Sequence, residues 1–193
     1  CISGHKYGSG SLCTITWAYL NLLEQDISDC TTEAINNSNY LKNKLKEDFK
    51  IHFIKDKECS HEFLIDTTEF NKLGYNDNLI CKRLMDYGFH APTVSWPIKN
   101  VLMIEPTESE SKKELDRFIN AMKGIKSEML KYNLNDSPLV NAPHTQRDLL
   151  KWNYKYSIEE GCYPLGFVTN KYWPTINKLD EATSDRKMLT QNR

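Results

Sequence analysis

The chain has 193 residues and an almost balanced charge, with 25 Lys and Arg against 26 Asp and Glu and a formal net charge of −1. This balance argues against a nucleic-acid-binding protein, because phosphate contacts need a surplus of basic residues. No apolar run approaches the roughly 18 residues of a membrane-spanning helix, so no membrane partner is expected. With 39% hydrophobic and 11% aromatic residues, the composition excludes a disordered chain and indicates one sizeable core.

The six cysteines are scattered and include no C-x-x-C pair. In a chain of this length such spacing indicates reduced thiols that serve mostly as small apolar fillers. The first residue is Cys1, and no signal peptide or other targeting segment precedes the first apolar stretch. We therefore expect the chain to be a piece of a longer protein.

The first half predicts two helices followed by two strands. Residues 8–26 begin with a Gly-Ser-Gly-Ser turn and continue at helical spacing, and a second helix is predicted at 31–47, with Lys42, Lys44 and Lys46 facing solvent. The alternation in 49–53 predicts a half-buried strand. Residues 61–66 predict a second strand, buried on both faces.

The middle of the chain predicts a helix, a strand and a long helix. Asn76 or Asp77 begins a short helix, and Gly88 lies where a left-handed C-terminal cap is needed. The two prolines of 90–97 favour a shaped loop or edge segment. Residues 101–104 predict a third strand. A long amphipathic helix is predicted from near Glu108 onward.

The remaining residues, 133–193, are interrupted by four prolines, and one helix is predicted at 145–152. The order helix, helix, strand, strand, helix, strand, helix predicts an α+β domain with a small antiparallel or mixed sheet covered by helices. The best internal boundary falls near residues 133–138.

A few residues stand out chemically. The turn at residues 8–11 lies at a helix N-terminus, which can bind phosphate or act as an ordinary cap. His90 follows two aromatic residues on a proline-rich loop and is either a ligand contact or a structural histidine. Glu105 ends a buried strand and has a better case for a site than Glu108 and Glu110, which complement the dipole of the predicted helix. No metal site is expected, since no second His stands at ligand spacing from His61.

Two segments of unusual composition carry a family resemblance: RLMDYGFHAPTVSWP at 83–97 and LMIEPTESESK at 102–112. They resemble the C-terminal part of the glycine cleavage system P-protein family, the pyridoxal-phosphate-dependent glycine decarboxylases. Further blocks keep the family's order, including ITWAY at 15–19, PLVNAPH at 138–144 and KYWPT at 171–175. The resemblance extends from about Ser3 to Leu189.

The resemblance implies the small C-terminal domain of a fold type I pyridoxal-phosphate enzyme with a loop-rich tail. On this basis residues 1–26 would end the large domain or connect to it, 27–133 would form the small domain, and 134–193 a C-terminal extension. The implied reaction decarboxylates glycine and passes its aminomethyl group to the lipoyl arm of the H-protein. The expected compartment is the bacterial cytoplasm or the mitochondrial matrix.

The resemblance also assigns candidate residues. Ser9 and Ser11 would lie near the cofactor phosphate, while His90, Thr93 and Glu105 would face the substrate. The family's Schiff-base lysine lies upstream of the Gly-Ser turn and is absent here, and Lys6 is either a chance likeness or a junction artefact. No catalytic residue is therefore expected in this fragment, and activity would need the missing remainder of the P-protein or a second copy. The alternative is a noncatalytic structural or regulatory domain derived from that family.

Overall fold

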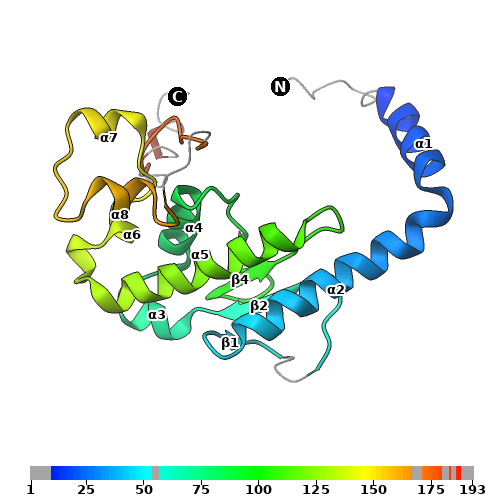
Figure 1. Cartoon of the computed structure of the whole chain (residues 1–193), viewed down its shortest axis with the longest axis horizontal. Helices are drawn as coiled ribbons and strands as arrows, with labels where there is room; N and C mark the ends of the chain where they lie inside the picture. Colours follow the sequence, from blue (N-terminus) through cyan, green and yellow to red (C-terminus); the bar gives the residue numbers. More distant parts are fainter. Residues whose placement is uncertain (1–9, 54–56, 167–170, 180–182, 184–185, 188–193) are drawn as a thin grey trace.

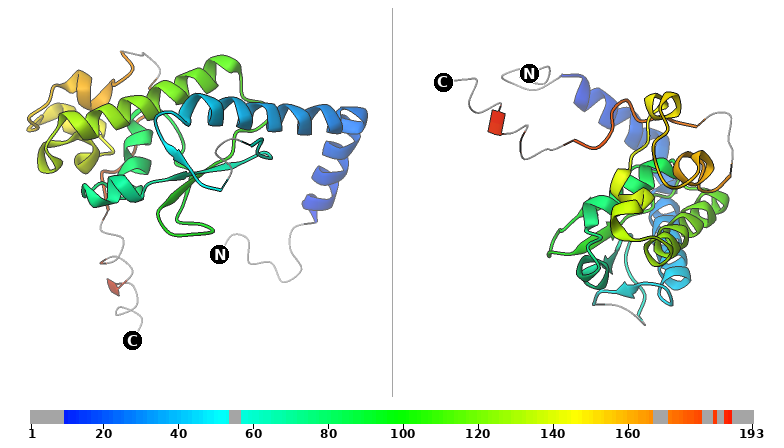
Figure 2. Two further views of the ribbon diagram at one scale, coloured as in Figure 1. Left: turned by 90° about the horizontal axis from the view of Figure 1, so that it is seen from below. Right: turned by 90° about the vertical axis from the view of Figure 1, so that its left-hand side faces the viewer.

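A four-stranded antiparallel sheet lies at the centre of the computed structural model, which describes residues 10–53, 57–166, 171–179, 183, 186 and 187. Its strands are β1 (Lys50–Ile51), β2 (Phe63–Asp66), β3 (Thr93–Val94) and β4 (Val101–Ile104), in the spatial order β1-β2-β4-β3. Helices α2 (Ile27–Leu45) and α5 (Lys112–Lys131) run over one face of this sheet (Figures 1 and 2). The predicted α+β class is confirmed, with every strand pair antiparallel.

The register of β2 and β4 explains which face is buried. Phe63 pairs with Ile104 and Ile65 with Leu102, and all four side chains belong to the core. The intervening pair, Leu64 and Met103, projects to the other face and is only half-buried. The sheet is therefore sealed by helices on one face, and β3 forms an open edge beside Met103.

Helices α2 and α5 supply most of the core opposite the sheet. Leu41 and Leu45 of α2 are buried, as are the apolar residues of α5 at a spacing of three or four: Leu115, Ile119, Met122, Ile125 and Met129. This is the predicted single apolar face of the long helix. Each such side chain contributes roughly 1.5–3 kcal/mol of transfer free energy when fully buried.

Helix α4 (Asp77–Asp86) begins as predicted. The Asn76 side chain accepts a hydrogen bond from the Leu79 N–H, and Gly88 after the helix has φ +79°. A short helix, α3 (Thr68–Lys72), precedes it and was not predicted.

The C-terminal part is built from short helices that pack beside α4 and α5: η2 (Leu134–Asp136), α6 (Pro138–Asn141), α7 (Gln146–Leu150) and α8 (Ile158–Cys162). The helix predicted at 145–152 is α7, with Thr145 at its N-cap. The buried Arg83 connects these layers, because its guanidinium donates to Glu128 on α5 and to the carbonyls of Glu160 and Gly161 on α8.

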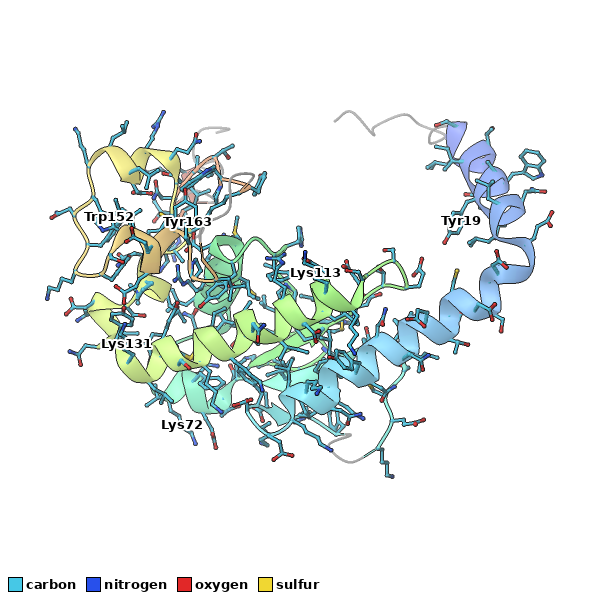
Figure 3. All side chains as sticks on the ribbon, viewed as in Figure 1. Tyr19, Lys72, Lys113, Lys131, Trp152 and Tyr163 are labelled. Atoms are coloured by element: carbon cyan, nitrogen blue, oxygen red, sulfur yellow. The ribbon has the colours of Figure 1, made fainter. Side chains whose placement is uncertain are left out.

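Helix α1 (Ser11–Leu23) stands apart from this body, joined to α2 through η1 (Glu24–Asp26). Figure 3 shows Tyr19 on α1 well away from the labelled residues of the domain. None of its residues is buried, and its exposed apolar side chains include Leu12, Ile15 and Trp17.

Four local predictions were wrong. Strand β2 is not buried on both faces, because Leu64 lies on the half-buried face of the sheet. The strand predicted at 49–53 ends at Ile51, because Phe53 adopts φ +66° and its side chain is 76% exposed. Lys42 does not face solvent: it is buried, and its ammonium donates to Asn39 Oδ1 and to the Lys57 carbonyl. The long helix begins at Lys112 rather than near Glu108, because Ser111 caps it by accepting from the Glu114 N–H.

None of the helices in the described part of the chain is long and apolar enough to cross a membrane.

Candidate functional site

A pocket of about 390 Å³ opens where helices α2 and α5 meet the edge of the sheet. Its floor and walls come from α2, from the loop that follows α4, from β3 and the end of β4, and from the start of α5. It is called the edge pocket below. The residues that line it are Leu41, Phe89, His90, Ala91, Pro92, Thr93, Met103, Ile104, Glu105, Pro106, Glu110, Glu114, Leu115 and Phe118.

The loop that carries His90 is fixed by Arg117 of α5. The Arg117 guanidinium donates to the Tyr87 carbonyl at 2.6 Å and to the Gly88 carbonyl at 3.2 Å. It also lies over the Phe89 ring, 3.7 Å from the centroid, and Phe89 meets Phe118 edge to face. These contacts hold the wall of the edge pocket in one conformation, because two carbonyls and a ring share one planar cation.

Asp77 fixes the β3–β4 hairpin through hydrogen bonds. The Ser95 hydroxyl donates to Asp77 Oδ2 at 2.7 Å, and the Thr67 hydroxyl donates to Oδ1 at 2.6 Å. Asp77 is buried at the start of α4. The segments that flank His90 and Thr93 are therefore held by Arg117, which is partly exposed, and by Asp77, which is buried.

Among the described residues, the carboxylates of Glu105, Glu110 and Glu114 stand around the edge pocket, and no Lys or Arg side chain lines it. Glu114 pairs with Arg117, whose hydrogen bonds lower the pKa of that carboxyl. Glu105 has His61 Nε2 at 4.0 Å from Oε1. No described Lys or Arg forms an ion pair with Glu105 or Glu110, so neither carboxylate is neutralised by direct contact with one of these cations.

The structure brings together all three predicted substrate-site residues, since His90, Thr93 and Glu105 line the same pocket. The His90 ring places Nδ1 3.0 Å from the Ala91 carbonyl. Ser11 is the first residue of α1, is exposed and does not line the edge pocket. Ser9 and Lys6 lie outside the described residues. The cofactor contacts predicted for Ser9 and Ser11 stay predictions.

Two residues of this site were not found by sequence reasoning. Glu110 was assigned to a helix N-terminus, but it precedes α5 and lines the edge pocket. The spacing Ser111-x-x-Glu114 is a common helix-start pattern and would have placed the helix one turn later. Arg117 carried no local signal, because its partners lie 29 and 30 residues earlier in the chain.

A second hollow, of about 400 Å³, lies on the other side of Glu105 and Pro106, against α1 and α2. Glu108 lines this hollow and does not line the edge pocket. Within the described ranges, no group of three His, Cys, Asp or Glu side chains is placed to hold a metal ion.

Comparisons with known proteins agree with one another. A protein-family model described as glycine dehydrogenase, C-terminal domain, matches residues 30–144. Proteins named glycine dehydrogenase (decarboxylating) from Jannaschia sp. and Salmonella arizonae are each 43% identical over 97% of this chain, and one from Psychrobacter cryohalolentis is 42% identical over the same share. The chain spans only 20–21% of the length of these relatives. On this match the chain belongs to the glycine dehydrogenase C-terminal domain family.

Proposed function

We propose that this chain is the C-terminal part of a glycine dehydrogenase (decarboxylating) and that its edge pocket faces the amine-bearing reactants. The observation that carries the proposal is the convergence of His90, Thr93 and Glu105 on one pocket. These residues lie within 16 positions of one another and belong to the two segments, 83–97 and 102–112, on which the family resemblance rests. The whole activity would require the part of the protein that corresponds to the remaining four-fifths of the relatives.

In the proposed reaction, glycine loses carbon dioxide and its aminomethyl group is transferred to the lipoyl disulfide of a carrier, the H-protein. The carbon–carboxyl bond breaks, a carbon–sulfur bond forms, and the sulfur–sulfur bond opens. The second sulfur takes a proton and becomes a thiol, so the disulfide is reduced by the two electrons that decarboxylation leaves behind.

Proteins of this family use pyridoxal phosphate, whose ring, when bound, withdraws electrons from the bond that breaks. The residues of the edge pocket do not fit this cofactor. In the described part of the chain, no lysine lines the pocket to form a Schiff base, and the three carboxylates there would repel a phosphate. Ser11, at the start of α1, is exposed on a helix that stands apart from the pocket. No step through the cofactor is therefore derived from this chain.

The contribution of this chain is the environment of the reacting amine. Glu105 and Glu110 favour a protonated amine over an anion at the pocket. The proposed division into residues 1–26, 27–133 and 134–193, and the bacterial cytoplasm or mitochondrial matrix as the compartment, belong to this same proposal.

A chimera tests the proposed function. The C-terminal fifth of the Salmonella arizonae relative would be replaced by this chain, and glycine-dependent release of carbon dioxide measured with pyridoxal phosphate and a lipoyl carrier. We expect activity within about tenfold of the intact relative. The same relative without any C-terminal fifth serves as the control. A folded, cofactor-loaded chimera with no more activity than this control would support a noncatalytic domain instead.

A further inference from the structure

We propose that the edge pocket binds the loaded carrier arm by its protonated aminomethyl end, and that glycine's carboxylate does not enter it. The occupant is thus an aliphatic thioether arm that ends in an ammonium group. This inference rests on the proposed function, and it names which of the two amine-bearing reactants the pocket receives.

The apolar part of the pocket suits an aliphatic arm. Phe89, Phe118, Leu115 and Leu41 contribute apolar side chains to the lining, and Phe89 and Phe118 are in edge-to-face contact. A volume of about 390 Å³ falls in the range of pockets that enclose small molecules. Free glycine offers a single CH₂ group to such a lining, whereas a lipoyl arm offers a chain of methylenes and sulfur.

The charged part of the pocket suits an ammonium end. Of the three carboxylates, Glu114 is engaged by Arg117, while Glu105 and Glu110 have no Lys or Arg partner among the described residues. Of the described basic side chains, His61 is the one paired with Glu105, at 4.0 Å, and it is exposed. An arriving ammonium would be attracted by the carboxylates that line the pocket, whereas a carboxylate ligand would be repelled by them.

The pocket is also preorganised for this ligand. Arg117 fixes the backbone at Tyr87 and Gly88 and packs on Phe89, so the wall does not need to be ordered on binding. Fixing a binding surface in advance raises affinity by reducing the entropy lost on association. Arg117 is therefore a positioning residue for the pocket.

Three small probes separate the contribution of charge to binding from the contribution of apolar contact. The isotope-labelled 193-residue chain would be titrated with n-hexylamine, 1-hexanol and hexanoate at neutral pH, and methyl NMR shifts of Leu41, Met103 and Leu115 recorded. We expect n-hexylamine to bind at least tenfold more tightly than either other probe. Binding of hexanol or hexanoate equal to that of the amine, or shifts that bypass these methyl groups, would overturn the proposal.

Glutamine variants locate the charge. E105Q/E110Q should lower the affinity for n-hexylamine about tenfold and leave 1-hexanol binding unchanged. E108Q is the matched control, since it removes the same charge from the same loop but outside the edge pocket, and less than a twofold change is expected. Equal losses in both variants would mean non-specific charge attraction. The single variants replace the double variant if it does not fold.

The binding test and the chimera test can fail independently of each other. An inactive chimera with selective amine binding would contradict the proposed function and leave an alkylammonium pocket, such as one for a partner protein's lysine. An active chimera without selective binding would contradict the assignment of the pocket alone.

Discussion

Asp66 shows how a single side chain of this fold responds to pH. Burial alone would raise the pKa of Asp66, but hydrogen bonds from Lys50 and from the hydroxyl and N–H of Thr68 outweigh it and lower the pKa to about 2. The carboxylate is almost fully buried, whereas Lys50 is largely exposed. The folded state therefore favours the ionised carboxylate more than the unfolded state does.

We expect D66N to reduce the free energy of unfolding by about 1–2 kcal/mol at pH 7, a figure discounted for the exposed lysine. Because the folded pKa is depressed, this stabilisation is complete above pH 4 and disappears as the pH falls toward 2. Urea unfolding of both proteins at pH 7, 4, 3 and 2 measures the difference. E33Q, an exposed change on α2, is the control. A difference in the free energy of unfolding that stays constant from pH 7 to pH 2 would contradict the role assigned to Asp66.

At the scale of elements, the contact between α4 and α5 depends on Gly124. A Cβ atom at Gly124 would lie 2.5 Å from the Tyr87 hydroxyl, which donates to Glu128 Oε1 at 2.9 Å. The close approach of the two elements therefore requires a residue without a side chain at this position.

We expect G124A to destabilise the protein by about 1–3 kcal/mol through overpacking, although alanine by itself favours a helix by about 1 kcal/mol. Thermal and chemical unfolding measure the net effect. G10A is the matched control, because nothing lies within 4 Å of a Cβ at that exposed position. A variant as stable as the parent would show that Tyr87 moves aside without cost.

The predictability of these elements differed for physical reasons. The core faces of α4 and α5 follow from a spacing of three and four residues, which the sequence contains directly. The exposure of Phe53 did not follow, because its left-handed backbone ends the strand where alternation alone would continue it. The prediction that Lys42 faces solvent was wrong because its ammonium donates to the carbonyl of Lys57, which lies beyond the next strand in the sequence.

The site residues also divide into those that carried a local sequence signal and those that did not. Glu105 and His90 carried local signals, a carboxylate after a buried strand and a histidine on a proline-rich loop. Their meeting in one pocket depends on how β3 pairs with β4, which no local pattern specifies. Arg117 acts through backbone carbonyls, and such contacts leave no trace in the identity of the partner residues.

At the scale of the whole molecule, Arg83 holds the C-terminal part to the sheet domain. Its guanidinium is fully buried and contacts Asp86, Glu128 and two carbonyls of α8. Asp86 in turn accepts from the backbone N–H of His144 and lies 2.8 Å from its Nδ1, while His144 Nε2 lies 2.7 Å from the Tyr156 hydroxyl. Residues on both sides of the predicted boundary near 133 thus share one buried polar network.

We expect R83M to reduce the free energy of unfolding by about 3–5 kcal/mol, because it leaves two acidic side chains without their buried cation. Unfolding should show one transition for α4, α5 and the residues after 133, monitored by hydrogen exchange. R147M, a change at an exposed arginine on α7, is the control. If exchange in the variant increased only after residue 133, with an unchanged free energy of unfolding for the rest, the two parts would be independent.

The proposed recognition of the ammonium end of the loaded carrier arm by the edge pocket is tested most directly by product inhibition. In the chimera, the inhibition constant of the aminomethyl-loaded carrier would be measured for the parent, E105Q/E110Q and E108Q. We predict that this inhibition constant rises about tenfold in E105Q/E110Q, equivalent to about 1.4 kcal/mol. In E108Q it should change less than twofold, and the KM for glycine should change less than twofold in both variants. The same inhibition constant in all three proteins would contradict the account.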